Sequence, residues 1–320
     1  MRNRQTLMKK KRRNDADTLD SLPTEQPNPR SADLDTKSSL EIAQIINAED
    51  ATVADGAERA LPQIARAIDW TAEALGNGGR LFYFGAGTSG RLAALDAAEC
   101  PPTFNTPPSM VQAIIAGGSG ALNRALEANE DSESLAIREI KKRRVGKRDV
   151  VVGIAASGRT PFTIAALTAA RRAGAKTIAI ACNPDTELER SADLAIVIET
   201  GPEVVCGSTR MKAGTAQKMA LNMISTGAMV RLGYVYGNLM VNMHRSNSKL
   251  AERSVAILQH AVGVEKDDAR GLMKSAKNSL PVAIVMAKAK VTRKRAEEAI
   301  RISKGDVRRA IAQSLADRPQ

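Results

Sequence analysis

The stretch RLFYFGAGTSGR, Arg80–Arg91, decides the fold of this chain. Its apolar first half has the length of a buried strand, and its second half is a glycine-rich turn that carries Thr88 and Ser89. The pattern after it predicts a helix over 92–99. Glycines let backbone N–H groups close on an anion, and the start of a helix adds partial positive charge. The stretch therefore predicts a strand, an anion-binding turn and a helix, in that order.

Two classes of ligand fit this turn. Its spacing matches GxGxxG, which occurs in dinucleotide sites. A dinucleotide also needs an acid at the end of the next strand, about 20 residues on. The next predicted strand, 111–116, ends instead in two glycines. The same chemistry then recurs where the predicted strand 149–156 runs into SGRTP, Ser157–Pro161. Two turns rich in hydroxyl groups favour one phosphate monoester over a dinucleotide.

Apolar strands alternate with helices along the middle of the chain. The predicted strands are 80–85, 111–116, 149–156, 176–182 and 194–199, and the helices between them are 92–99, 122–142 and 162–173. This alternation predicts an α/β fold with three layers, in which helices cover both faces of a parallel sheet. Ligands of such sheets bind at the C-terminal ends of the strands, where both hydroxyl-rich turns fall.

The flanking parts are predicted to be helical or poorly ordered. Helical periodicity is present at 39–46, 57–75, 219–232, 239–260, 266–275, 280–288, 292–302 and 307–315. We predict three parts: a poorly ordered basic leader over 1–36, an α/β domain over 37–262 and a small helical domain over 263–320.

Composition narrows the classes of partner. The formal net charge is +12, but much of the excess lies at the two ends, in 9–13 and 288–309. Aromatic residues make up only 2%, which counts against base stacking on an aromatic platform, so we expect no nucleic-acid partner. The leader lacks the apolar stretch of a secretory signal, and no segment approaches the roughly 18 apolar residues of a membrane helix. We therefore expect a cytoplasmic protein with no membrane partner.

Cysteine and histidine usage indicates neither disulfides nor a metal. Cys100, Cys182 and Cys206 are an odd number without CxxC spacing, which favours reduced residues of the core. The two histidines, His244 and His260, have no ligand-cluster spacing, so we expect no zinc site.

Two carboxylates lie near the hydroxyl-rich turns. Glu99 is predicted to end the helix 92–99, because Pro101 and Pro102 follow it. Glu130 falls in the predicted helix 122–142. Each alone is more often a solvated surface acid. As a pair beside a phosphate site, they could act as a general acid and a general base.

Four motifs in order resemble the N-acetylmuramic acid 6-phosphate etherases, which belong to the sugar isomerase (SIS) domain superfamily. They are GAGTSGRL (Gly85–Leu92), DAAECPPTF (Asp96–Phe104), GIAASGRTP (Gly153–Pro161) and STRMKAGTAQK (Ser208–Lys218). The resemblance runs from about Thr24 to near the C-terminus, and only the basic leader departs from the usual pattern.

The resemblance implies cleavage of the D-lactyl ether of N-acetylmuramic acid 6-phosphate, giving N-acetylglucosamine 6-phosphate and D-lactate. It also implies that Glu99 is the catalytic acid and Glu130 a second essential carboxylate. We assign to Glu130 the removal of the proton on carbon 2 of the open-chain sugar. Glu99 then protonates the departing ether oxygen and activates the water that adds at carbon 3. No metal or redox cofactor is required.

The predicted phosphate ligands come from both turns. They are the hydroxyls of Thr88, Ser89, Ser157 and Thr160, with backbone amides at Gly87 and Gly158. One or two of these hydroxyls can instead be ordinary helix N-caps. Arg210 and Lys212 fit either a contact with the sugar or phosphate or a plain salt bridge.

The spacing along the first helix raises a question about subunits. Eleven helical residues from Thr88 to Glu99 span about 16 Å, which is longer than a hexose phosphate. Either the helix bends back at the proline pair, or an acid enters from a neighbouring subunit. The resemblance favours a homodimer with the site at or near its interface.

Two other functions remain open. A sugar-phosphate sensor would resemble the glucokinase regulatory proteins, which carry two sets of such turns, whereas this chain has one. A sugar-phosphate isomerase would also use a carboxylate base but would not account for the ECPP sequence at Glu99–Pro102.

Overall fold

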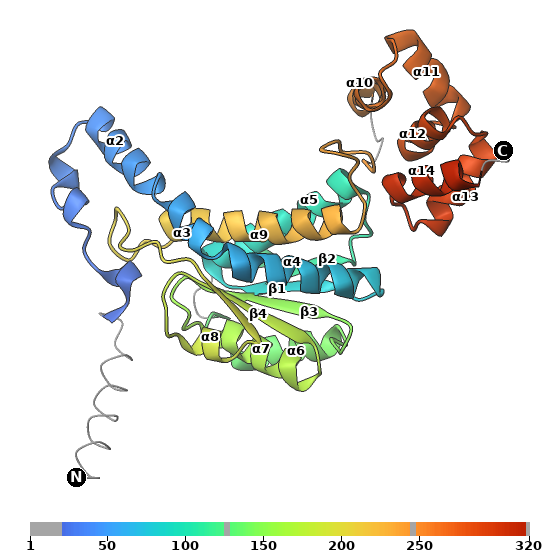
Figure 1. The fold of residues 1–320 in the computed structure, drawn as a ribbon. Coiled ribbons are helices and arrows are strands. Elements are labelled where there is room, and N and C mark those ends of the chain that lie inside the picture. The colour runs from blue at the N-terminus through green and yellow to red at the C-terminus, as the bar shows by residue number, and fades with distance from the viewer. Residues whose placement is uncertain (1–20, 125–128, 244–247, 318–320) are drawn as a thin grey trace. The chain divides into compact units, whose positions relative to one another are not determined.

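A parallel sheet of five strands forms the centre of the α/β part of the chain (Figure 1). The computed structural model describes residues 21–124, 129–243 and 248–317. The strand order is β2-β1-β3-β4-β5. The strands are β1 (Leu81–Gly85), β2 (Val111–Ile115), β3 (Val150–Ile154), β4 (Lys176–Ala181) and β5 (Leu194–Val197). The predicted parallel α/β sheet is confirmed.

The register aligns the C-terminal ends of the central strands. Gly85 at the end of β1 pairs with Ile115 of β2 on one side and with Ile154 of β3 on the other. Every residue of β1 and β3 is buried, as expected of strands covered on both faces. The turns that follow β1 and β3 therefore leave the sheet side by side.

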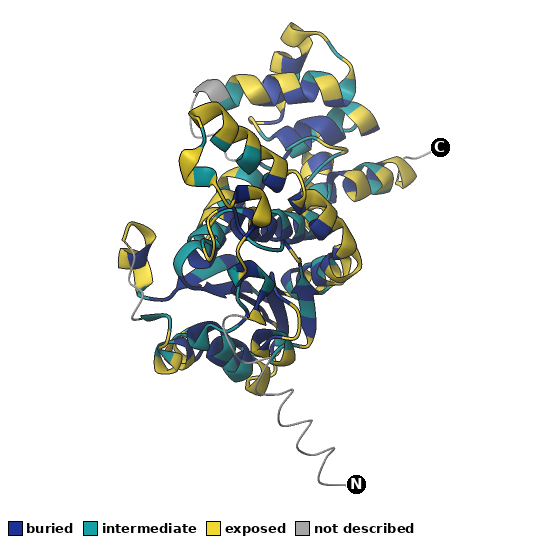
Figure 2. Cartoon of the chain, turned by 90° about the vertical axis from the view of Figure 1, so that its left-hand side faces the viewer, coloured by how far each residue is buried: buried dark blue, intermediate teal, exposed yellow. Residues whose placement is uncertain are grey.

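Helices cover both faces of the sheet (Figure 1). On one face lie α4 (Leu61–Gly76) and the first parts of α5 (Gly87–Phe104) and α9 (Lys212–Arg231). On the other lie α6 (Glu133–Lys142), α7 (Pro161–Arg172) and α8 (Glu187–Arg190). The buried strands and the exposed outer sides of the helices are apparent in Figure 2. The three-layer arrangement is therefore confirmed.

Alternate side chains of β1 anchor the two helical layers. Phe84 packs against Phe162 of α7, with ring centroids 6.0 Å apart. Tyr83 points to the opposite face, where its hydroxyl donates to Asp96 of α5 at 2.9 Å. Asn222 of α9 donates to the same carboxylate at 2.7 Å. Asp96 thus ties α5 and α9 to each other and to the sheet.

The chain divides into two compact units. The first contains 1–96 and 111–224, and the second contains 97–110 and 225–320. The division falls inside α5 and α9, whereas the predicted domain boundary is at 262/263. The second unit has its own aliphatic core, which includes Leu258, Ile284 and Val285. Its helices include α10 (Ser248–Val262), α11 (Lys266–Ser275), α12 (Leu280–Ala289), α13 (Arg293–Ile302) and α14 (Val307–Ala316).

The segment after residue 20 is more ordered than its composition suggests. Residues 1–20 of the predicted leader lie outside the described residues. The remainder forms three short 3-10 helices, η2 (Pro23–Glu25), η3 (Pro29–Ser31) and η4 (Leu34–Thr36), and α2 (Ser39–Asp50) and α3 (Val53–Arg59) follow. Hydrogen bonds between its polar side chains and distant loops hold this segment. A poorly ordered 21–36 is therefore wrong, because those polar residues are buried partners.

The helix α5, which follows the first glycine-rich turn, differs from its predicted bounds. It was expected over 92–99 but begins at Gly87 and continues through Pro101 and Pro102 to Phe104. The prolines lie in its last two turns, where they remove only the donors to two carbonyls one turn earlier. The helix ends where Asn105 takes a positive φ of 54°, a conformation typical of helix C-termini.

Two other predicted helices begin later than expected. The helix 122–142 is replaced by η5 (Gly118–Leu122) and by α6, which begins at Glu133. Residues 125–128 lie outside the described residues. Left-handed backbone at Gly117 ends the preceding strand segment and turns the chain into η5. The helix 239–260 begins only at Ser248, since an irregular segment with an isolated bridge from Tyr236 to Leu239 precedes it.

The structure tests two predictions, that the cysteines are reduced core residues and that the chain has no membrane helix. None of the three cysteines forms a disulfide, and Cys100 and Cys182 are buried as expected. Cys206 is exposed, which corrects its assignment to the core, because it lies in the loop after β5. Within 21–124, 129–243 and 248–317, no helix is long and apolar enough to cross a membrane. His260 is exposed, and His244 lies outside the described residues.

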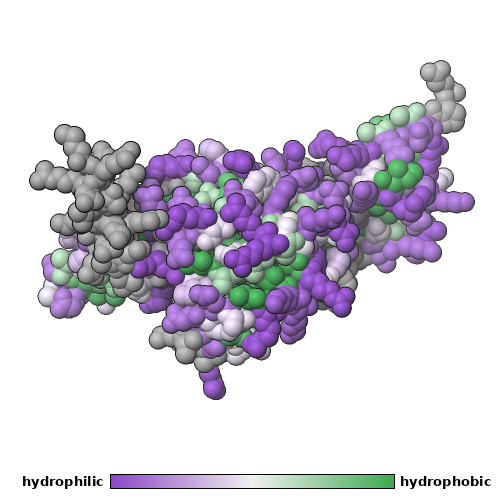
Figure 3. All heavy atoms as spheres, turned by 90° about the horizontal axis from the view of Figure 1, so that it is seen from below, coloured by the Kyte–Doolittle hydropathy of each residue, from purple (hydrophilic) through white to green (hydrophobic). Residues whose placement is uncertain are grey.

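The outer layer carries an apolar groove between α6 and α7. It has a volume of about 640 Å³, with Ile137, Ile164 and Ala165 among its apolar residues and Lys141 and Arg172 among its charged ones. Figure 3 shows apolar side chains gathered on this face among hydrophilic ones. None of the predicted site residues lines the groove.

Candidate functional site

The turn after β1 brings two hydroxyl side chains to the start of α5. Gly87 begins this helix with a positive φ of 50°, and Thr88 and Ser89 follow in its first turn. A side chain at Gly90 would come within 2.5 Å of Cγ1 of Ile115, so only glycine lets α5 approach β2 this closely. The helix N-terminus is thereby held at the edge of the sheet, with its first amides directed at the turn.

The turn after β3 also contains a glycine with a positive φ and no room for a side chain. Ser157 Oγ accepts a hydrogen bond from Arg159 N at 3.3 Å, and Gly158 N donates to Ala155 O at 3.1 Å. Gly158 has a φ of 68°, and a Cβ there would lie 2.4 Å from Cβ of Thr186. Thr160 is the N-cap residue of α7, but its side chain makes no capping bond. The N-cap alternative for Thr160 therefore does not apply.

Glu130 lies between these two turns. It is in a turn before α6, and its carbonyl accepts a hydrogen bond from Phe162 N in the first turn of α7 at 2.9 Å. Its Oε1 lies 3.1 Å from the point where a Cβ on Gly87 would stand. The backbone of Glu130 is thus fixed to one turn and its carboxylate faces the other. The structure brings Gly87, Ser157 and Glu130 into one region of the first unit.

A third segment reaches the same region from after β5. Gly214 of α9 packs against Thr88, with 3.6 Å between its Cβ position and Thr88 Cγ2. Just before it, Arg210 is exposed in a turn. The start of α9, within the motif that contains Arg210 and Lys212, therefore packs beside the first turn. We call this helix start the wall beside the first turn.

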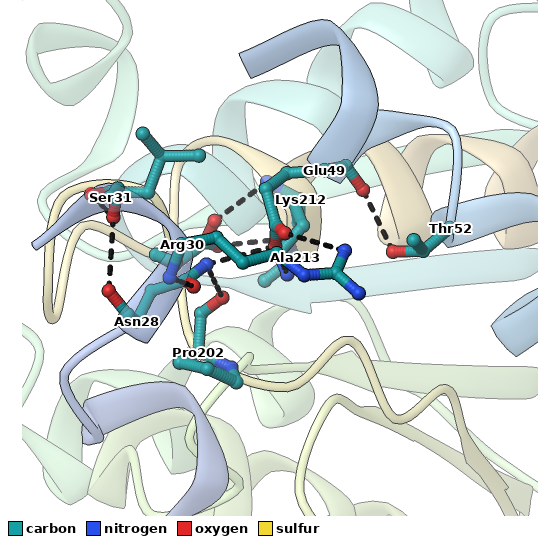
Figure 4. A network of polar contacts seen from close by, with 10 residues as sticks. Asn28, Arg30, Ser31, Glu49, Thr52, Pro202, Lys212 and Ala213 are labelled. Carbon is teal, nitrogen blue, oxygen red and sulfur yellow. Dashed lines mark hydrogen bonds and ion pairs between the residues drawn. The ribbon is translucent and has the colours of Figure 1, made fainter. Parts of the chain in front are cut away.

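Lys212 points away from that wall into a buried ion pair (Figure 4). Its Nζ lies 2.6 Å from Oε2 of Glu49 at the end of α2, and the two side chains are only 3% and 5% exposed. Asn28 and Arg30 also donate to this carboxylate, at 2.9 and 3.1 Å. Of the two alternatives for Lys212, the structure has the salt bridge.

Glu203 occupies the N-terminus of α9. Its carboxylate accepts from the backbone N–H groups of Lys212 at 2.9 Å and Ala213 at 3.0 Å. Burial raises the pKa of Glu203, and the two backbone donors and the Lys212 charge offset part of that rise. Because a protein carboxylate already fills this helix start, α5 and α7 are the remaining candidates for the anion-binding helix starts.

Glu99 is exposed on α5, in the part of that helix that belongs to the second unit. Sequence reasoning found Glu99 and Glu130 but missed Glu49 and Glu203. Glu49 lies in the last turn of α2, whose sequence resembles that of an ordinary surface helix, and Glu203 follows β5 by several residues. Neither has a local signal, because the partner of each is distant in sequence.

A separate cavity of about 530 Å³ adjoins the edge strand β2. Its lining is largely apolar, including Ile115, Leu122 and Phe162, with Asn129 among the polar residues. None of the predicted phosphate ligands lines it. In the described part of the chain, no group of three or more His, Cys, Asp or Glu side chains is placed to hold a metal ion.

Two family models match this chain. One describes the glucokinase regulatory protein N-terminal SIS domain and matches residues 63–171, and the other describes the SIS domain and matches residues 134–227. Both matched ranges include β3 and the turn at Ser157.

Similar proteins cover nearly the whole chain. An N-acetylmuramic acid 6-phosphate etherase of Clostridium botulinum (strain Langeland) is 46% identical over 294 residues, which are 92% of this chain and 97% of that protein. One of Symbiobacterium thermophilum is 54% identical over 267 residues, which are 83% of this chain and 89% of that protein. A solved phosphoheptose isomerase of Francisella tularensis is 18% identical and covers 60% of this chain and 98% of its own, with a TM-score of 0.47.

Two glycines with the same φ of 68°, Gly118 and Gly158, are predicted to differ in how much an alanine substitution destabilises the fold. Gly118 has open space at its Cβ position, whereas Gly158 faces Thr186 at 2.4 Å. We expect Gly118→Ala to lower the free energy of unfolding by about 1 kcal/mol through backbone strain. Gly158→Ala should cost about 1–3 kcal/mol more, because the added methyl overpacks the contact. Urea unfolding of both variants checks this, and equal losses would show that the contact is not restrictive.

The buried pair also predicts a pH dependence of stability. Burial alone would raise the pKa of Glu49, but hydrogen bonds from Lys212, Asn28 and Arg30 hold it below its ordinary 4.5. The stability that Glu49 contributes is therefore present above that value and is lost as the pH falls through the lower folded-state pKa. We expect Glu49→Gln to lower Tm strongly near neutral pH and progressively less as the pH is lowered into the acid range below 4.5.

A surface pair at the same distance provides the control. Glu73 and Lys176 also approach to 2.6 Å, but their side chains are 62% and 41% exposed. Glu73→Gln should change Tm little at neutral or acid pH, because exposed pairs contribute about 0–1 kcal/mol. A loss of Tm in Glu49→Gln that is the same at neutral and acid pH would contradict the linkage.

Proposed function

The chain belongs to the N-acetylmuramic acid 6-phosphate etherase family, and on that basis we propose how its residues carry out the reaction. It is an enzyme, a carbon–oxygen lyase that cleaves the D-lactyl ether of N-acetylmuramic acid 6-phosphate. Elimination followed by hydration gives N-acetylglucosamine 6-phosphate and D-lactate. The observation that carries the site assignment is the carboxylate of Glu130, which faces Gly87 between two glycine-rich turns.

The phosphate is held at the starts of α5 and α7. Thr88, Ser89, Ser157 and Thr160 supply hydroxyl groups, and Gly87 and Gly158 supply backbone amides. Support comes from the register, which ends β1 and β3 at the same edge, and from the positive φ at both glycines. Arg210, exposed beside this wall, supplies a positive charge that attracts the phosphate and carboxylate of the substrate. Lys212 acts through its ion pair and does not contact the substrate.

The two carboxylates divide the proton transfers. In the open-chain sugar, the aldehyde makes the hydrogen on carbon 2 acidic, and the lactyl ether on carbon 3 is a β-leaving group. Glu130 removes that proton while Glu99 protonates the departing ether oxygen, which leaves an unsaturated aldehyde and D-lactate. Glu99, now a carboxylate, takes a proton from water as it adds at carbon 3, and Glu130 returns its proton to carbon 2. Both groups end as they began, and no cofactor takes part.

Release of D-lactate from N-acetylmuramic acid 6-phosphate tests this function. We expect wild type to release it, and Glu99→Gln and Glu130→Gln to lose about 10²–10⁴-fold in kcat, since each lacks a proton-transfer group. Glu133→Gln is the matched control, because Glu133 is an exposed acid three residues beyond Glu130. A folded wild type that binds sugar phosphate without releasing lactate would favour the sensor function suggested by the first family model.

The active protein is a homodimer in which one site uses both subunits. Support comes from α5, which runs on through Pro101 and Pro102 and so does not turn back at the proline pair. Of the two alternatives raised by the sequence, this favours an acid that enters from a second copy. The absence of disulfides among its three cysteines fits a cytoplasmic location.

Mixing two inactive variants tests the shared site. If Glu99 and Glu130 of one site come from different subunits, a mixed dimer of Glu99→Gln and Glu130→Gln has one intact site. Random reassociation should then restore about a quarter of wild-type activity, because half of the dimers are mixed and each has one intact site in two. No recovery after verified subunit exchange would place both acids on one chain.

A further inference from the structure

The segment Leu22–Asp50, which we call the N-terminal strap, is bonded to two loops and to the start of α9 at the C-terminal edge of the sheet. These three segments are distant from it in sequence, by 159 to 174 residues. Figure 4 shows its contacts with two of them. Because these segments adjoin the proposed phosphate-binding turns, the bonds of the strap restrain the backbone around those turns.

The first bond reaches the turn after β3. Thr24 N donates to Asn183 Oδ1 at 3.2 Å, and Asn183 Nδ2 donates to Thr24 Oγ1 at 2.9 Å. The same amide nitrogen donates to Ala156 O at 3.0 Å. Thr24 and Asn183 are both fully buried. Since Ala156 directly precedes Ser157, Thr24 restrains the backbone from which the second phosphate-binding turn starts.

The second set of bonds surrounds Glu203. Asn28 donates to Pro202 O at 3.3 Å, and Ser31 Oγ donates to Val204 O at 2.7 Å. The strap therefore holds the residue on each side of Glu203, whose carboxylate binds the first amides of α9. This arrangement fixes where α9 begins.

The third bond is the ion pair of Glu49 with Lys212, in the first turn of α9. Two residues on, Gly214 packs against Thr88 of the first phosphate-binding turn. A buried ion pair adds little net stability over a well-packed apolar pair, but its directional bonds set one geometry. The pair is therefore better suited to set the position of α9 than to stabilise the fold.

We propose that Thr24 and Glu49 of the N-terminal strap are positioning residues of the sugar-phosphate site, acting on its two turns through Asn183 and Lys212. The strap itself does not touch the substrate. It holds the turn after β3 from one end and the wall beside Thr88 from the other. This inference rests on the proposed phosphate site at α5 and α7.

The test measures binding separately from turnover. The dissociation constant for N-acetylglucosamine 6-phosphate is measured by calorimetry, together with KM and kcat for lactate release, well below Tm. We expect Glu49→Gln to weaken binding and raise KM at least about tenfold, with kcat changed much less, because the turns move relative to each other. Thr24→Val, which keeps the side-chain shape, should do the same to a smaller extent and remains informative if Glu49→Gln does not fold.

Arg80→Met is the matched control. Arg80 forms a salt bridge of 2.8 Å with the nearly buried Asp149, but both residues precede their strands, at the opposite end of the sheet. This variant should lower Tm and leave the dissociation constant and KM unchanged. If Glu49→Gln and Thr24→Val behave like Arg80→Met, the strap is only structural and the proposal is wrong.

A double-mutant cycle separates positioning from direct contact by Lys212. If Lys212 acts through Glu49, Lys212→Met and Glu49→Gln weaken binding no further together than the worse of them alone. Additive losses would mean that Lys212 contacts the ligand independently, which would overturn this part of the proposal. Binding by wild type without lactate release would refute the etherase activity and leave the positioning result readable.

Discussion

The pairing of β1 with β3 is the constraint on which the site depends. Parallel strands end at the same edge of a sheet, and the register places Gly85 opposite Ile154. The helices that follow these two strands must therefore begin beside each other, and the positive end of each helix dipole lies at this edge. Two weak anion sites become one site with two helix starts. Glycines at Gly87, Gly90 and Gly158 permit the close approach that this needs.

The helices α5, α7 and α9 begin at this edge, and the protein uses their starts differently. Glu203 supplies a carboxylate to α9 from the chain itself, so that helix is structural at its N-terminus. The starts of α5 and α7 carry the hydroxyl groups, and Glu130 lies between them. Positive charge at a helix start attracts a carboxylate as well as a phosphate. Glu130 thus shares one electrostatic environment with the anion that its substrate brings.

The N-terminal strap extends the site beyond the sheet. Its bonds reach two loops and the start of α9, and its buried residues other than Leu22 are polar. Hydrogen bonds and ion pairs are directional, so they set the position of a segment more narrowly than an apolar contact does. This explains how a short segment whose only buried apolar residue is Leu22 remains ordered. The strap is held in place by buried hydrogen bonds to distant segments of the chain and not by a hydrophobic core of its own.

The sequence by itself determined the strands, the two glycine-rich turns and the parallel sheet, because each depends on local pattern. Apolar runs of strand length followed by Gly and Ser or Thr can be recognised without knowing their neighbours. Local pattern also suggested a helix break at Pro101 and a helix at Glu130, and both were wrong. A positive φ at Asn105 ends the first helix, and Glu130 lies in a turn before α6 begins at Glu133.

Only the tertiary structure decided the strand order, the pairing of Lys212 with Glu49 and the burial of Thr24, Asn28 and Glu203. Lys212 could have met substrate or a carboxylate, and its sequence neighbourhood is the same in both cases. Its partner is 163 residues away and comes close only when the strap crosses the edge of the sheet. Contacts between distant segments leave no period or motif in either one, so they become visible only when the chain has folded.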